Sequence, residues 1–368
     1  MSTSKRAFGL ALVPLCVWIA SIGVAEALFR QLGAKPSAEL GGLYENFGDA
    51  SYKHRSFVDT DAAWIEGHFS VFTDELGLRC SQTNMQRKLS DDTDILVIGD
   101  SQGYGQGLNF EDTVVGELTK RAEVYGLAVR NASVGGHLLD NQFELIRWLY
   151  GRGLRPKRLV VMLTPSLVAG AGHKTHAVVD DQGRIWARHP QWYSRVTLWL
   201  KTHTVVYVMV RKVFLHALPV SEPPVVGLYS INSEAERQAN FLANVAIFQQ
   251  WAHERGIPVY IVYVPLAIEL DFSPVSQAAQ ASGTKVDPNS PYRIARSVSE
   301  ALGLPFHDLR PSLVHERANG RQLSLFKDPH YNAATSRICA DDIWQFLRAT
   351  KPELQASMHR LGEEHDGN

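Results

Sequence analysis

Short apolar runs alternate with amphipathic stretches along the middle of this chain. The run Ile95–Ile98 is apolar at every position, which is typical of a strand buried on both faces of a parallel sheet. Further strands are predicted at 128–132, 159–163 and 259–264 and near residue 306. Because these strands alternate with helices, the pattern predicts an α/β fold with a doubly wound, mostly parallel sheet of five strands.

Apolar residues at helical spacing predict the helices between these strands. They indicate a helix over 114–125, one over 139–150, one or two over 196–218, one that begins at a capping box of Ser233 and Glu236, one over 292–302 and a last one over 333–347. Long irregular stretches at 164–194 and 271–291 follow the third and fourth strands. Since both leave the sheet at the edge where the first strand ends, we expect them to wall a cleft.

An apolar segment near the N-terminus stands apart from this alternation. Lys5 and Arg6 precede a run from Ala7 to Val24 that, with the residues up to Phe29, has about the ~20 residues of a membrane helix. The basic flank predicts a cytoplasmic tip at 1–6 and places the rest of the chain outside the cytoplasm. We expect a single-pass anchor in the cytoplasmic membrane over 7–29, with an extracytoplasmic, periplasmic domain behind it.

Two alternatives to that anchor stay open. Ala25-Glu26-Ala27 fits a signal-peptidase site, and cleavage there would give a secreted protein. A buried core helix is the other alternative, although a terminal apolar run behind two basic residues favours the membrane. The domains that we predict are the tip, the anchor, a spacer and strand-rich lead-in at 30–68, a main domain at 69–350 and a polar tail at 351–368.

Composition excludes several classes of partner. The chain has 368 residues, and 37 Lys and Arg balance 38 Asp and Glu, so no strong field favours nucleic acid. The three cysteines, Cys16, Cys80 and Cys339, lack the spacing of a metal site, and we expect neither a metal nor another cofactor. A disulfide bond between Cys80 and Cys339 is one interpretation. The apolar face around Cys339 predicts instead a buried free thiol.

A serine at the end of the first strand is the candidate nucleophile. Gly99-Asp100-Ser101 follows the apolar run, at the sheet edge where ligands and chemistry usually lie. The glycines at 103, 105 and 107 do not have the spacing of a nucleotide loop. A serine hydroxyl needs a base, and Asp328-Pro329-His330 offers one before the last helix, with His330 as base and Asp328 as its orienting group. Asn332 is a candidate helix cap.

Three segments in this order resemble the SGNH (GDSL-type) hydrolase superfamily: Gly99–Ser101, Asn131–Gly136 and Asp328-x-His330. Together with Phe72–Arg79, they are similar to its membrane-anchored bacterial branch, which includes alginate-type polysaccharide O-acetyltransferases. The resemblance covers roughly 69–347 and implies a flavodoxin-like sheet.

The resemblance also implies roles for single residues. Ser101 corresponds to the nucleophile, Asp328 and His330 to its partners, and the backbone N–H groups of Ser101 and Gly136 to the oxyanion donors. The family's third motif usually ends in an asparagine, but this chain has Thr164-Pro165-Ser166 there, and Ser166 could donate only one hydroxyl.

Aromatic residues crowd the stretch after the third strand. Trp186, Arg188, Trp192 and Tyr193 would suit a sugar chain at a cleft rim, but aromatic residues of this kind also simply pack a cap. His173 and His176 have no carboxylate or cysteine pattern that would make them metal ligands.

The resemblance implies a membrane-anchored serine acyl-transfer enzyme that acts on O-acetyl groups of a cell-envelope or exported polysaccharide. A glycan would be the acceptor, and a membrane acyltransferase would supply the acyl donor. Two alternatives stay open: a carbohydrate esterase or deacetylase of the same fold, and a catalytically inactive glycan-binding module. The sequence does not identify the glycan or distinguish transfer from hydrolysis.

Overall fold

The structure is a computed structural model that describes residues 17, 20–32, 42–47, 51–64, 67–173, 178–180, 184–186, 196–197, 199–200, 203–210, 224–325 and 328–350. The chain forms two compact units. One consists of residues 1–39 with 189–221, and the other, the main unit, of residues 40–188 with 222–368.

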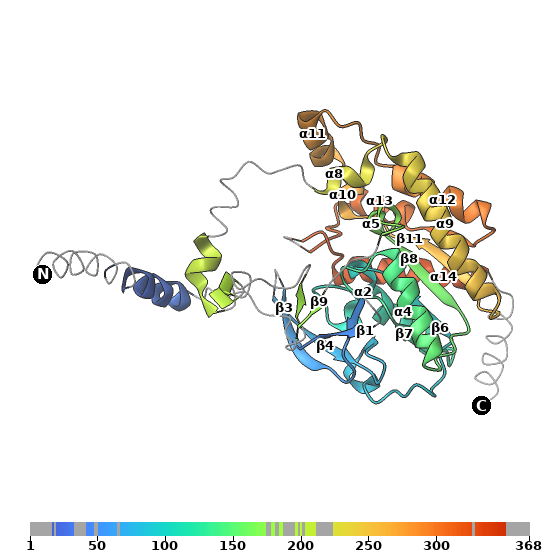
Figure 1. Cartoon of the computed structure of the whole chain (residues 1–368), viewed down its shortest axis with the longest axis horizontal. Helices are drawn as coiled ribbons and strands as arrows, with labels where there is room; N and C mark the ends of the chain where they lie inside the picture. The colour runs from blue at the N-terminus through green and yellow to red at the C-terminus, as the bar shows by residue number, and fades with distance from the viewer. Residues whose placement is uncertain are drawn as a thin grey trace, which may run out of the picture. The chain divides into compact units, whose positions relative to one another are not determined.

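An eight-stranded sheet runs through the main unit (Figure 1). Its five parallel strands are β6 (Ile95–Ile98), β7 (Val129–Asn131), β8 (Leu159–Leu163), β11 (Val259–Tyr263) and β12 (Phe306–Asp308). They lie in the order β12-β11-β8-β6-β7, which is the flavodoxin-like order. The predicted α/β class and all five predicted strands are therefore confirmed.

The predicted number of strands is wrong, because the lead-in joins the same sheet. Three strands extend it in antiparallel fashion: β5 (Arg79–Cys80), β4 (Gly67–Thr73) and β3 (Asp59–Trp64). Arg79 pairs with Asn131, so the lead-in covers the edge of β7 that would otherwise be open. Two small antiparallel sheets, β1 (Tyr44–Phe47) with β2 (Ser51–His54) and β9 (Val178–Val179) with β10 (Ile185–Trp186), belong to the same unit.

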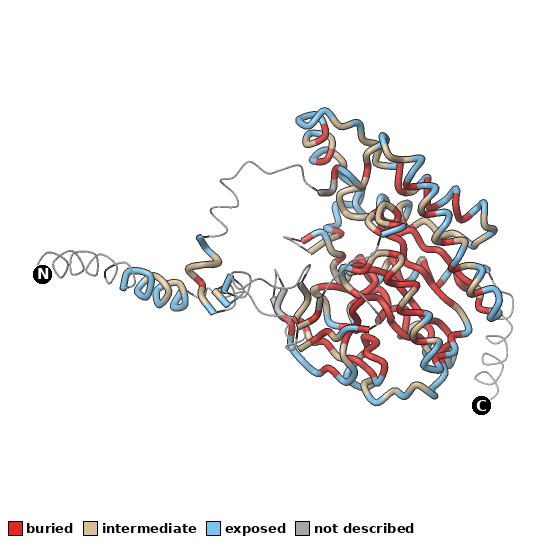
Figure 2. Tube along the Cα trace, viewed as in Figure 1, coloured by how far each residue is buried: buried red, intermediate tan, exposed pale blue. Residues whose placement is uncertain are grey.

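Helices cover both faces of the sheet, as a doubly wound fold requires. The face of Ile95 and Val97 packs on α3 (Val114–Glu123), α13 (Arg310–Ala318) and α14 (Ala333–Ala349). The face of Leu96 and Ile98 packs on α4 (Leu139–Gly151), α9 (Glu234–His253) and α12 (Ser290–Ala301). The four residues of β6 are all fully buried, and Figure 2 shows the burial concentrated along the central strands.

Three local predictions are wrong. The stretch 164–194 is not irregular throughout, since it contains α5 (Pro165–Ala169) and the strands β9 and β10. The stretch 271–291 is not a loop, since α10 (Ala267–Leu270) precedes it and α11 (Ser273–Ser282) lies within it. Pro274 in the first turn and Gly283, whose φ of 70° ends the helix, provide its start and stop. The capping box at Ser233 does not form either: Ser233 precedes α9, but its side chain makes no capping bond. A further short helix is α8 (Pro224–Tyr229).

Both described cysteines are free and buried, so the predicted free thiol at Cys339 is confirmed. Burial raises the pKa of Cys80 to about 12 and raises the pKa of Cys339 as well. We expect neither thiol to react with iodoacetamide in the native protein, and both to react in denaturant without reductant. Intact-mass measurement checks this, with Cys339→Ser as a control that loses one adduct. Two thiols that stay blocked until reduction would contradict it.

No helix within the described residues is long and apolar enough to cross a bilayer. Most of the predicted anchor at 7–29 lies outside those residues, which begin with residue 17 and resume at 20–32.

Candidate active site

The nucleophile turn joins β6 to the short helix α2 (Ser101–Tyr104). Ser101 is the first residue of that helix, and the buried Asp100 caps it by accepting a hydrogen bond from the Gln102 N–H at 2.9 Å. The second carboxylate oxygen of Asp100 accepts a bond from the Thr164 hydroxyl. Burial raises the pKa of Asp100, although these two bonds act in the opposite direction. The carboxylate therefore fixes the serine between the ends of β6 and β8.

The glycines after Ser101 serve the packing of this turn. A Cβ at Gly103 would lie 2.6 Å from the Ser133 hydroxyl oxygen, so a larger residue there would force the Ser133 side chain to move. Gly105 ends α2 with a φ of 81°, and Gly107 has a φ of 86°, both in the left-handed region. These contacts explain the glycine pattern without a bound phosphate.

The structure brings Ser101, His330 and Asp328 together. The Ser101 Oγ lies 2.8 Å from His330 Nε2, and His330 Nδ1 bonds to Asp328 Oδ1. Since a carboxylate only accepts, Nδ1 carries the proton and Nε2 is the acceptor that faces the serine hydroxyl. The side chains of His330 and Asp328 are 15% and 4% exposed, so the histidine is reachable and its partner is not.

The histidine loop is held by bonds that the sequence did not indicate. The buried Gln102 donates through Nε2 to the Pro329 carbonyl at 3.2 Å and accepts from the Tyr331 N–H at 3.2 Å. The Tyr331 hydroxyl donates to the Pro265 carbonyl. Asn332 caps α14 by accepting from the Thr335 N–H at 2.9 Å, as the sequence predicted. Gln102 thus clamps the main chain on both sides of His330.

Gln102→Leu, which removes both bonds, is expected to lower kcat for an acetyl ester by roughly 10–10²-fold with little change in KM, because a small displacement of the base weakens proton transfer. Gln102→Glu keeps the acceptor for the Tyr331 N–H, so its kcat should lie between those of the parent protein and of Gln102→Leu. Steady-state kinetics over a range of pH checks this, since a displaced histidine also shifts the pH profile. A Leu variant with the parent kcat and pH profile would show that the clamp does not position His330.

The turn at Asn131–Gly136 lies beside the nucleophile. A Cβ built on Gly135 would be 3.9 Å from the Ser101 Cβ, and Gly136 has a φ of 79°. Asn131 Nδ2 donates to the Gly103 carbonyl at 3.0 Å, which ties this turn to α2. The role of the Gly136 N–H as an oxyanion donor stays a prediction.

Tyr52, from β2, is hydrogen-bonded to the same turn. Its hydroxyl donates to the Gly135 carbonyl at 2.8 Å, and its own carbonyl lies 2.6 Å from His137 Nε2. Burial lowers the pKa of His137 to about 4, so this histidine is neutral at pH 7 and donates from Nε2. No pattern in the lead-in indicated this contact, since Tyr52 and Gly135 are 83 positions apart.

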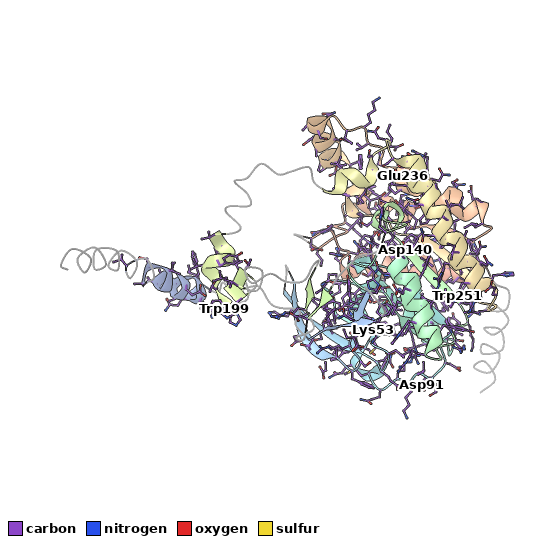
Figure 3. All side chains as sticks on the ribbon, viewed as in Figure 1. Lys53, Asp91, Asp140, Trp199, Glu236 and Trp251 are labelled. Atoms are coloured by element: carbon purple, nitrogen blue, oxygen red, sulfur yellow. The ribbon has the colours of Figure 1, made fainter. Side chains whose placement is uncertain are left out.

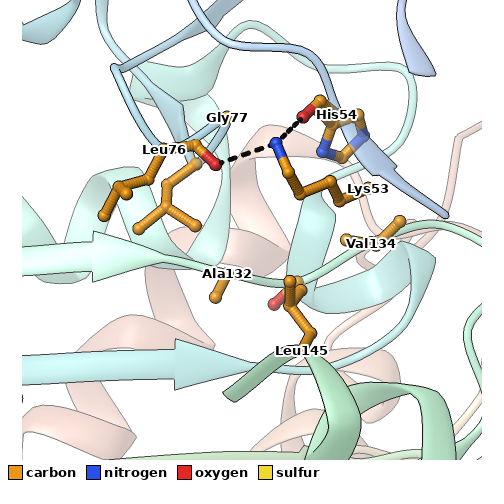
Figure 4. Close-up of a pocket in the computed structure, with 9 residues that line it drawn as sticks. Lys53, His54, Leu76, Gly77, Ala132, Val134 and Leu145 are labelled. Atoms are coloured by element: carbon orange, nitrogen blue, oxygen red, sulfur yellow. Dashed lines mark hydrogen bonds between the residues drawn. The ribbon is translucent and has the colours of Figure 1, made fainter. Parts of the chain in front are cut away.

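A small internal space lies behind this turn (Figure 4). Lys53 and His54 from β2 face Val134 and Leu145 across it, and Lys53 Nζ donates to the carbonyls of His54 at 3.1 Å and Leu76 at 3.4 Å. The space has no room for a water molecule. It is a gap in the packing between the lead-in and the sheet, and it is too small to be a ligand site.

The remaining predicted site residues are not brought to the triad by any described contact. Ser166 lies in α5, where its carbonyl accepts the Gly170 N–H at 2.9 Å, and its oxyanion role stays a prediction. Trp186 ends β10 with a side chain outside the described residues, and Arg188, Trp192 and Tyr193 lie outside them altogether. The described part of the chain contains no group of three or more His, Cys, Asp or Glu that could hold a metal ion.

A serine, histidine and aspartate aligned at the carboxyl edge of a doubly wound α/β sheet have the parts that a serine esterase or acyltransferase uses. No family model and no curated protein matches the chain. Among solved structures, it is similar to TesA (16% identity, TM-score 0.40, 69% of this chain and 98% of that chain). It is also similar to the acetyl xylan esterase AlAXEase (16%, 0.39, 68% and 98%) and to the psychrotrophic esterase EstA from Pseudoalteromonas sp. (12%, 0.38, 70% and 98%). With TM-scores below 0.5 these likenesses carry no argument for the site, whose class is defined by the chain's own residues.

Proposed function

We propose that this protein is a membrane-anchored, extracytoplasmic SGNH-type serine acyl-transfer enzyme that acts on O-acetyl groups of a cell-envelope or exported polysaccharide. The observation that carries the proposal is the 2.8 Å contact between Ser101 Oγ and His330 Nε2, with Asp328 on the other ring nitrogen. A glycan-binding module would have no use for this alignment. The basic flank and apolar run at the N-terminus support the anchor.

In the proposed reaction, Ser101 Oγ attacks the acyl carbonyl while His330 Nε2 takes the hydroxyl proton. Asp328 stabilises the imidazolium, and the backbone N–H groups of Ser101 and Gly136 stabilise the oxyanion, with the Ser166 hydroxyl as a further donor. His330 then returns the proton to the departing oxygen, and an acyl-Ser101 ester remains. Water or a sugar hydroxyl then gives its proton to His330 Nε2 and attacks this ester. His330 returns that proton to the departing Ser101 Oγ, and the free acid or the acylated sugar leaves.

Transfer and hydrolysis share the acyl-serine intermediate and differ in what resolves it. For a transferase, we expect slow hydrolysis of p-nitrophenyl acetate by the parent protein. Turnover should rise severalfold when a glycan acceptor is added, because a bound acceptor attacks the ester more effectively than water. Mass spectrometry of the glycan should show added acetyl groups, and none should form with Ser101→Ala.

The opposite outcome would favour the esterase. If turnover is fast in water alone and acceptor sugars only compete with the ester, without gaining acetyl groups, the protein is a deacetylating hydrolase of the same fold. Release of acetate from a naturally acetylated glycan by the parent protein would then establish that activity.

A further inference from the structure

The first unit contains two helical segments that are joined by a group of polar bonds. Residues 20–31 form one helical segment and residues 205–210 the other. The Glu26 carboxylate accepts hydrogen bonds from the N–H groups of Val205 and Val206, both at 2.9 Å. Arg30 donates to Glu26 Oε1 at 2.8 Å and to the His203 carbonyl at 2.7 Å. Glu26 therefore caps the second segment from 179 positions away.

Two hydroxyl groups among the described residues of this unit donate to carbonyls of their own segment. The Ser21 hydroxyl donates to the Val17 carbonyl at 2.8 Å, and the Thr204 hydroxyl donates to the Leu200 carbonyl at 2.7 Å. Both bonds return to the same segment four residues earlier, which leaves neither hydroxyl in need of water. The His203 ring stacks on Trp199, with ring centroids 5.0 Å apart.

Large apolar side chains make up much of the exposed surface of these segments, beside the exposed Ser21, Arg30 and Gln31. Glu26 and Arg30 are the only Asp, Glu, Lys or Arg side chains among this unit's described residues, which also include His203, and the two pair with each other. The exposed large apolar residues are Val17, Ile22, Val24, Leu28 and Leu32, on or beside the first segment, Met209 and Val210 on the second, and Val196 and Trp199 ahead of the second in the chain. Trp199 is labelled in Figure 3.

We infer that residues 203–210 are a second membrane-contacting segment, which enters the bilayer beside the N-terminal helix and is held there by Glu26. The inference rests on the proposed membrane anchor, because the apolar run 7–24 behind Lys5 and Arg6 continues directly into the first segment. In lipid, main-chain N–H groups at a helix start must find partners within the protein, and Glu26 supplies them. Charged groups at membrane depth pair, as the Glu26 side chain, 19% exposed, does with Arg30, whose side chain is 52% exposed.

The test uses the full chain, with Cys16 replaced by serine, in vesicles of phosphatidylcholine and phosphatidylglycerol that carry brominated acyl chains. A fluorescent NBD label is placed by Val210→Cys, by Leu28→Cys or by Val124→Cys, the last being an exposed apolar position on the main unit. Cys80 and Cys339 are buried and stay unlabelled. We expect quenching at 28 and at 210 to be at least about twofold greater than at 124, because bromine quenches only labels that reach the acyl chains.

A second variant tests the role of Glu26. Glu26→Leu removes both acceptors but keeps the first segment apolar, so quenching at 210 should fall towards the value at 124 while quenching at 28 persists. Glu26→Gln, which retains one acceptor oxygen, should give an intermediate value at 210. Equal quenching at 210 in the parent and in Glu26→Leu would overturn the role of Glu26.

Three further results would overturn the inference. Quenching at 28 but not at 210 would leave the anchor intact and remove the second segment from the membrane. A label at 210 that becomes shielded without lipid as protein concentration rises would show that a second copy of the chain covers this surface. Quenching at neither position would remove the anchor as well. Fluorophosphonate labelling of Ser101 in the same samples reports on the proposed enzyme activity independently.

Discussion

Ser101→Ala is expected to abolish covalent labelling by a fluorophosphonate and to lower ester turnover by at least roughly 10³-fold, since the nucleophile of such a site cannot be replaced by its neighbours. His330→Ala should have a comparable effect, because without the base the hydroxyl stays protonated. The free energy of unfolding should change little in either variant, since neither side chain lies in the apolar core. Labelling followed by intact-mass measurement, and turnover of p-nitrophenyl acetate, check both effects.

Matched controls separate loss of the reaction from loss of the fold. Ser297→Ala and His315→Ala change the same residue types at exposed positions on α12 and α13, and both should keep the parent labelling and turnover. Full labelling of Ser101→Ala by the fluorophosphonate would show that another residue is the nucleophile.

Arg79→Met is expected to lower the free energy of unfolding by about 3–5 kcal/mol, because it leaves buried main-chain carbonyls without a donor. Arg79 is 1% exposed and lies on β5. Its guanidinium donates to the carbonyls of Gly105, at 2.9 Å, and of Tyr104 and Leu108, and it stacks on the Tyr104 ring at 4.2 Å. These carbonyls belong to the segment that follows Ser101, so activity should fall together with stability.

Arg87→Met is the control for this change. Arg87 donates to one carbonyl, that of Val129, at 2.8 Å from a half-buried position, so its loss should cost about 1 kcal/mol. Chemical denaturation of both variants measures the difference. A destabilisation by Arg79→Met that is no larger than that by Arg87→Met would mean that the guanidinium does not hold the loop.

The regular part of the fold was predictable, because its signals are local. Ile95–Ile98 is apolar throughout, and Phe241, Val245 and Phe248 recur on the buried face of α9. β5 has two residues and no pattern of its own, and it is a strand because it pairs with β4 on one side and, through Arg79, with the distant Asn131 on the other. The α11 helix has just two buried apolar residues, Val275 and Ala279, so a polar composition concealed it.

The same distinction applies to the site. The triad could be predicted because Ser101 ends the first strand and His330 precedes the last helix, and a parallel sheet brings both positions to one edge. The hydrogen bonds of Gln102 to the main chain around His330 could not be predicted, because a glutamine beside a nucleophile has no required partner. Gln102 and Pro329 are 227 positions apart in the sequence. Tyr52 was missed for the same reason, since its bond to Gly135 exists only once the lead-in has packed on the sheet.

The separation of Ser101 from His330 by 229 positions has a consequence for the timing of activity. A chain that has been synthesised only as far as β11 already contains the whole nucleophile turn but no base to activate it. The hydroxyl of such an incomplete chain is an ordinary alcohol and does not react with acyl esters at neutral pH. In the proposed enzyme, the serine would therefore gain its base only once the segment before α14 has packed against Gln102.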